Sequence, residues 1–123
     1  MRPKGPGAAT LALDLTLRPG WHVSAAQPLQ DDLIPTRVRL TGDTTGWHLG
    51  ECRYPPSEIL TLVFQREPLA GYQGRVRIEA ALERTADPLG QAHPWAPVEL
   101  HLQVCSDALC LPPETLFFQV PDP

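Results

Sequence analysis

Apolar and polar residues alternate with a period of two along most of this chain. In the clearest runs every second side chain is aliphatic: Leu11–Leu17, Val76–Leu82 and Val98–Val104. Because successive side chains of a β-strand point to opposite faces, each run predicts a strand with one buried face. Shorter strands are predicted at Trp21–Val23, Val38–Leu40 and Leu116–Val120, and the more continuous apolar run Ile59–Phe64 predicts a central strand.

Turn-forming residues separate these segments. Fifteen prolines and nine glycines interrupt the chain every few residues, which favours short strands and turns over long helices. A turn of helix fits the pattern only at Ala80–Ala86. Strands without crossover helices pair mainly antiparallel, so we predict an all-β fold of two packed antiparallel sheets, with an up-and-down barrel as the alternative.

The length and charge of the chain narrow the class of protein. A chain of 123 residues predicts one domain, which we place at residues 8–120, with linker-like Gly/Pro-rich ends at 1–7 and 121–123. The net charge of −4 argues against nucleic acid as a partner, because phosphate binding requires a basic surface. No apolar run approaches the ~20 residues that span a bilayer, and residues 1–7 lack the apolar segment of a signal peptide. We expect the mature domain of a longer protein.

Two of the three cysteines, Cys105 and Cys110, directly follow the predicted strand Val98–Val104. A turn over Ser106–Leu109 would place them opposite each other in a hairpin, about 4.5–5.5 Å apart at Cα, which a disulfide accommodates. That bond closes a loop of about six residues and contributes about 2 kcal/mol, whereas a bridge to Cys52 would contribute about 4 kcal/mol. The close pair is a poor choice for stability alone. From the residues themselves, a redox-active pair and a structural disulfide are equal alternatives.

A metal site is a weaker alternative. His101 lies four residues before Cys105, and strict alternation puts both on one strand face. Structural zinc sites use a gap of about two to four residues between paired cysteines and need a fourth ligand, which we cannot place. We expect no metal and no cofactor. Cys52 is the odd thiol, and we expect either a small buried hydrophobic residue or a thiol near the Cys105/Cys110 pair.

The segment Cys105–Thr115, CSDALCLPPET, resembles the cysteine–acid–cysteine–Pro-Pro segment of the N-terminal domain of the thiol:disulfide interchange protein DsbD family. Further segments resemble the family in the same order along the chain: Pro19–Val23, Tyr54–Pro56 and Gly71–Gly74. Together these matches span nearly the whole chain. In the family one more residue separates the cysteines, so we expect the hairpin turn to differ here.

This resemblance implies an immunoglobulin-like antiparallel β-sandwich in the periplasm or another extracytoplasmic compartment, tethered to the membrane in the full-length protein. It implies a protein-disulfide reductase domain that takes electrons from a membrane-embedded domain, a donor in the same full-length protein. The domain would pass them to thioredoxin-like thiol proteins, such as disulfide isomerases and cytochrome-maturation factors. Cys110 resembles the family's exchanging thiol, and Cys105 its resolving partner.

The resemblance also points to neighbours of the site. Asp107, inside the turn, would raise the pKa of a nearby thiol by charge repulsion, or it is an ordinary turn aspartate. His22 is expected near the pair by alignment, with a surface position as the alternative. A mobile loop caps the disulfide in the family, and we assign it to Glu51–Glu58 with Tyr54 as its aromatic lid and Tyr72 as the second choice. The alternative for Tyr54 is a residue that only caps a sheet edge.

The alternative function is a β-sandwich binding or interaction module with a purely structural disulfide. A ligand-binding module would use Trp21, Trp47 and Trp95 as a stacking platform. Isolated tryptophans are more often core or rim residues.

Overall fold

The computed structural model describes residues 2–5, 8–29, 33–61, 68–85 and 89–121. The described residues form strands and connecting loops without a helix, and no described segment is a helix long and apolar enough to span a membrane. In chain order the strands are β1 (Arg2–Gly5), β2 (Ala8–Thr16), β3 (His22–Ser24), β4 (Arg37–Leu40), β5 (Trp47–Arg53), β6 (Glu58–Leu60), β7 (Leu69–Gln73), β8 (Arg75–Arg84), β9 (Trp95–Leu102), β10 (Val104–Cys105) and β11 (Glu114–Pro121).

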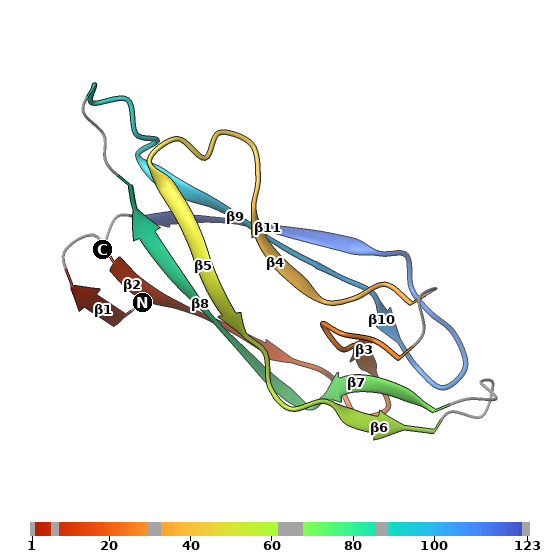
Figure 1. Ribbon diagram of the computed structural model, residues 1–123. Coiled ribbons are helices and arrows are strands. Elements are labelled where there is room, and N and C mark those ends of the chain that lie inside the picture. The colour runs from red at the N-terminus through yellow and green to blue at the C-terminus, as the bar shows by residue number, and fades with distance from the viewer. Residues whose placement is uncertain (1, 6–7, 30–32, 62–67, 86–88, 122–123) are drawn as a thin grey trace.

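The strands form three antiparallel sheets. One sheet has the order β1-β2-β8-β5, the second β11-β9-β4, and the third β10-β3-β7-β6. The first two are the long layers of the sandwich, and the third lies at the end of the molecule opposite β1 (Figure 1). The predicted all-β, immunoglobulin-like antiparallel sandwich is confirmed.

The alternating pattern places one face of each long strand in a common core. Val76, Ile78 and Leu82 of β8 are buried there, and so are Val98 and Leu100 of β9. Side chains from the third sheet join the same cluster: Val23 and Tyr72. Burying a large aliphatic side chain stabilises by about 1.5–3 kcal/mol, so all three sheets are held through one core.

The chain changes sheets at Gln103, and this change positions the cysteines. The long run predicted as a single strand is divided: β9 ends at Leu102 beside β4 and β11, and β10 starts at Val104 beside β3. Cys105 therefore belongs to the end sheet, whereas His101 belongs to the long sheet. Strict alternation across Gln103, which placed Cys105 and His101 on one face, is wrong because the two residues lie in different sheets.

Several elements differ from the expectations. Residues 2–5, expected in a linker, form β1 and pair with β2. Of the described residues in the expected central strand Ile59–Phe64, only the first two lie in a strand, the edge strand β6, and Ile59 is 63% exposed. Residues 62–67 lie outside the described part. Ala80–Arg84 continues strand β8 rather than turning into a helix. Strands β5 and β7 had no clean alternation and were not predicted.

Candidate functional site

A short hairpin joins the two cysteines. Cys105 and Cys110 form a disulfide with a Cα–Cα distance of 4.0 Å, and they are opposed as an antiparallel bridge. The backbone bonds lie on either side of the pair: the Leu111 N–H donates to the Val104 carbonyl at 2.9 Å, and the Ser106 N–H to the Leu109 carbonyl at 2.8 Å. The cysteines thus occupy a non-hydrogen-bonded pair, the position where opposed Cα atoms come closest.

Ser106 organises the turn between them. Its Oγ accepts from the N–H groups of Ala108 at 3.1 Å and Leu109 at 3.2 Å. A serine at the start of a turn that bonds the following amides is a recognised sequence signal, yet the expectations gave Ser106 no role. Gln103 holds the segment that follows Cys110, because its Nε2 donates a hydrogen bond to the Leu111 carbonyl at 3.0 Å. No local sequence signal predicts that contact.

The two cysteines have opposite environments. Cys105 is 8% exposed, whereas Cys110 is exposed together with its neighbours in the loop. Leu109 and Leu111, which flank Cys110, are 51% and 41% exposed. A partner thiolate therefore has access to Cys110, inside an apolar rim, and far less access to Cys105.

His22 lies beside the disulfide. It is the Cα partner of Cys105 in the ladder between β10 and β3, and on its other side it opposes Gln73 of β7. Directly opposed residues of an antiparallel ladder share a face, so Cys110, Cys105, His22 and Gln73 form one row across the end sheet. His22 is 5% exposed, and burial lowers its pKa below the ordinary 6.5.

Asp107 is exposed at the hairpin turn. Sequence proximity alone connects it to the two sulfur atoms, so its expected effect on a thiol pKa stays a prediction. Pro112 and Pro113, which follow Cys110 closely in the chain, are exposed as well.

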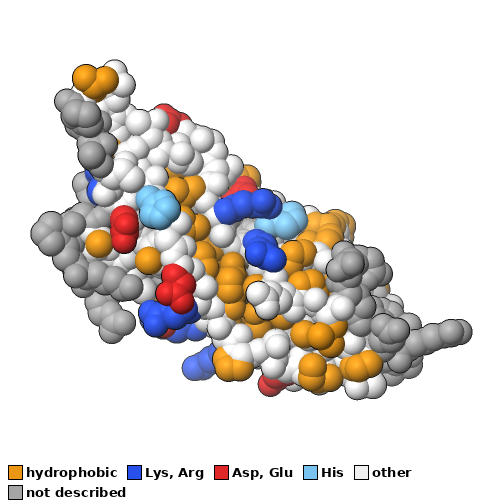
Figure 2. Space-filling model, in the orientation of Figure 1, with side chains coloured by type: hydrophobic (Ala, Val, Ile, Leu, Met, Phe, Trp, Pro, Cys, Tyr) orange, Lys and Arg blue, Asp and Glu red, His pale blue; other side chains and the backbone are white. Residues whose placement is uncertain are grey.

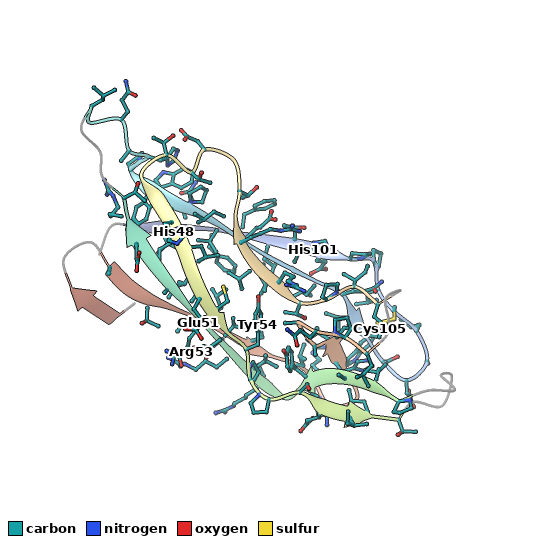
Figure 3. All side chains as sticks on the ribbon, viewed as in Figure 1. His48, Glu51, Arg53, Tyr54, His101 and Cys105 are labelled. Carbon is teal, nitrogen blue, oxygen red and sulfur yellow. A yellow bond between two sulfur atoms is a disulfide. The ribbon has the colours of Figure 1, made fainter. Side chains whose placement is uncertain are left out.

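Tyr54 and Cys52 lie at a separate place. The Tyr54 hydroxyl accepts a hydrogen bond from the Val38 N–H at 3.0 Å, and its ring packs against the core. Figure 3 shows Tyr54 in the middle of the molecule and Cys105 at the end that carries β10. Cys52 lines the same pocket as Tyr54, about 410 Å³ in volume, and is the free cysteine. Burial raises the pKa of its thiol, and a hydrogen bond with Tyr54 partly offsets this.

Tyr72, the second lid candidate, is a core residue. It is 5% exposed, and its hydroxyl accepts from the Ala26 N–H at 3.1 Å. Among the described residues, then, neither tyrosine contacts the disulfide through a hydrogen bond. The role of a lid stays a prediction for both.

The remaining candidates are held by other contacts. Trp47 is buried, and its indole N–H donates to the His93 carbonyl at 2.8 Å, so its ring is not free for a stacking platform with Trp21 and Trp95. The His101 Nδ1 lies 2.9 Å from the Thr115 hydroxyl. Across the residues that are described, no three His, Cys, Asp or Glu side chains gather as a metal-ligand group.

Of the comparisons with known proteins, one identifies a family and another finds no match. No curated protein sequence matches the chain. The sequence does match one protein family over residues 5–122, described as thiol:disulfide interchange protein DsbD, N-terminal. The match includes both members of the disulfide hairpin, the strand that carries His22 and the core of the sandwich. This chain belongs to the family of the DsbD N-terminal domain.

Proposed function

We propose that this chain is an extracytoplasmic thiol–disulfide exchange domain that relays electrons through Cys105 and Cys110 to partner thiol proteins. The observation that carries the proposal is the unequal exposure of the two sulfur-bearing residues, with Cys110 exposed and Cys105 8% exposed. Exchange proceeds by attack of a thiolate on one sulfur of a disulfide. Unequal access selects Cys110 as that sulfur and leaves Cys105 to resolve the mixed disulfide.

In the reducing direction, two successive attacks by the sulfurs of the domain reduce one partner disulfide. The Cys110 thiolate attacks a partner disulfide, forms a mixed disulfide and releases one partner thiolate. The Cys105 thiol then loses its proton and attacks the Cys110 sulfur, which closes Cys105–Cys110 and releases the second partner thiolate. Two electrons pass to the partner, and the domain is left oxidised.

The family supports the partners and the location that we propose. Thioredoxin-like thiol proteins outside the cytoplasm would accept the electrons, and a membrane-embedded domain, in the same full-length protein, would supply them. Exposed Leu109 and Leu111 give the exchanging sulfur an apolar surround that suits docking of such a protein. In this role the domain acts as a protein-disulfide reductase.

Trapping tests the assignment of the sulfurs. Cys105→Ser, made in a Cys52→Ala background, should accumulate mixed disulfides through Cys110, because the resolving thiol is missing. Cys110→Ser in the same background is the matched control and should trap far fewer. If Cys110→Ser traps partners and Cys105→Ser does not, the roles of the two sulfurs are reversed.

The redox potential of the pair separates exchange from a structural disulfide. A structural disulfide lies below about −300 mV, and an exchange pair well above it. Equilibration against glutathione or dithiothreitol buffers measures this value. A potential below that limit would favour the alternative, an interaction module with a permanent disulfide.

A further inference from the structure

The resolving cysteine is buried beside a histidine. Cys105 and His22 are directly opposed in the ladder between β10 and β3, and they are 8% and 5% exposed. Opposed side chains on one face of an antiparallel pair have Cβ atoms about 4.5–5.5 Å apart. An imidazole at this distance lies within reach of a thiol on the neighbouring strand after a small rotation of either side chain.

Burial creates a need for a proton acceptor at this position. Only a thiolate attacks a disulfide, and an apolar environment disfavours the thiolate. Cys110 is exposed and can lose its proton to water, but Cys105 is largely closed to water. His22 is suited to accept the proton, because its own burial lowers the pKa and keeps the ring neutral at neutral pH.

We propose that His22 accepts the proton of the Cys105 thiol when Cys105 attacks the mixed disulfide at Cys110; this inference rests on the exchange function proposed above. The S–H bond of Cys105 breaks, and its proton moves to a ring nitrogen of His22. The Cys105–Cys110 bond forms as the bond between Cys110 and the partner breaks. The partner sulfur leaves with the electron pair, and His22 returns its proton to that sulfur or to water.

The strands on either side of His22 place no charged side chain opposite it, so the proton passes between His22 and Cys105. From β10 the group facing it is Cys105, and from β7 it is the uncharged amide Gln73. The carboxylate of the hairpin, Asp107, is exposed at the turn. The imidazole–thiol pair should therefore act as a unit whose total proton count stays constant between the pKa of His22 and the pKa of Cys105.

A two-step reaction with an aromatic disulfide isolates the resolving step. The reduced protein, in a Cys52→Ala background, is mixed with excess dithiobis(nitrobenzoate) in a stopped-flow instrument. Attack by Cys110 releases one coloured thiolate, and closure of Cys105–Cys110 releases a second. The rate of the second release is measured from about pH 5.5 to pH 9 for the background protein, His22→Gln and the control His48→Gln. His48 is an exposed histidine on β5, well away from Cys105 in Figure 3.

With His22 present, the second release should vary little with pH between the two pKa values, because the reactive thiolate–imidazolium form carries the same number of protons as the resting pair. In His22→Gln it should rise about tenfold per pH unit up to the thiol pKa and be about 100-fold slower at pH 7, as expected on losing a positioned base. His48→Gln should match the background. Circular dichroism checks the fold of each variant.

Two results would overturn the inference without touching the exchange function: equal pH profiles in His22→Gln and the background, or a slowing by one constant factor at every pH, which is a structural effect. If His22→Gln does not fold, the pH profile of the background protein still tests the inference. A rate of the second release that rises tenfold per pH unit from pH 6 to 8 would show that His22 does not accept the proton of Cys105. Absence of the second release in the background protein would overturn the exchange function itself.

Discussion

A hydroxyl group at a sheet edge gives Tyr54 a structural role. Strand β4 pairs with β9 on one side only, and the Val38 N–H on its other side is bound by the Tyr54 hydroxyl at 3.0 Å. An unpaired, partly buried backbone N–H is costly, so this contact stabilises the edge of the second long sheet. Tyr54, which the sequence predicted as a lid, thus caps the edge of a strand in the fold, and its role as a lid stays a prediction.

Removing this hydroxyl should affect stability and leave the disulfide chemistry alone. We expect Tyr54→Phe to lower the free energy of unfolding by about 0.5–1.5 kcal/mol, the worth of one hydrogen bond. The rate at which glutathione reduces Cys105–Cys110 should not change. Urea unfolding and a reduction time course measure the two quantities.

Tyr72→Phe is the matched control for the loss of stability, because the Tyr72 hydroxyl also accepts one backbone hydrogen bond, from the Ala26 N–H. Tyr54→Ala distinguishes the structural role of Tyr54 from the role of a lid. Faster reduction of the disulfide in Tyr54→Ala, with little loss of stability, would assign the lid to Tyr54 after all.

Among the elements, the hairpin that carries Cys110 depends on its turn more than on packing. Residues 107–114 are exposed, and the arms are joined by two backbone hydrogen bonds, the Ser106 contacts and the Gln103 hydrogen bond. A hairpin arm that is held by few contacts can bend toward a partner while Cys105 stays in the sheet.

Figure 2 shows hydrophobic side chains gathered over the part of the molecule where β6 and β7 lie.

Ser106→Ala should therefore make the disulfide easier to reduce. Losing the Oγ acceptor of two backbone amides weakens the turn by about 0.5–1.5 kcal/mol, and the reduced cysteines then meet less often. For a two-electron couple this corresponds to a potential about 10–30 mV less negative. Equilibration in glutathione buffers measures the shift. Ser57 is an exposed serine before β6, and the control Ser57→Ala should leave the potential unchanged. An unchanged potential in Ser106→Ala would show that the turn does not stabilise the disulfide.

For the whole molecule, the core lies outside the redox hairpin. Its buried members come from strands of all three sheets, and the disulfide is attached to β10 at the border of that core. This separation suits a domain that must remain folded in both redox states.

Reduction of the Cys105–Cys110 disulfide should therefore lower the free energy of unfolding only slightly. The bond closes a loop of about six residues and contributes about 2 kcal/mol, which is less than the about 5–15 kcal/mol of a typical domain. We expect the reduced protein to unfold cooperatively, with a Tm lower by about 6–12 °C. Thermal unfolding with and without dithiothreitol, in a Cys52→Ala background, measures this. Unfolding of the reduced chain at 25 °C would show that the disulfide is a structural support.

The sequence by itself determined what depends on local pattern. Alternation in β8 and β9 predicted which side chains are buried, because a strand has only two faces. The run of Cys105, a four-residue turn and Cys110 predicted a hairpin disulfide, because a short loop closes in few ways. The segment around it indicated the family, which the match over residues 5–122 confirms.

Only the tertiary structure decided which strands are neighbours. The change of sheet at Gln103 moves Cys105 beside β3, and no local pattern announces it, since Val104 continues the alternation of β9. No local pattern predicts β5 either, because its register is interrupted between Leu49 and Cys52. Nor does a local pattern predict the hydrogen bond of Tyr54, because its partner Val38 belongs to another strand. Pairing between distant segments is selected by the summed burial and hydrogen bonding of the complete fold, and those quantities exist only once the sheets are assembled.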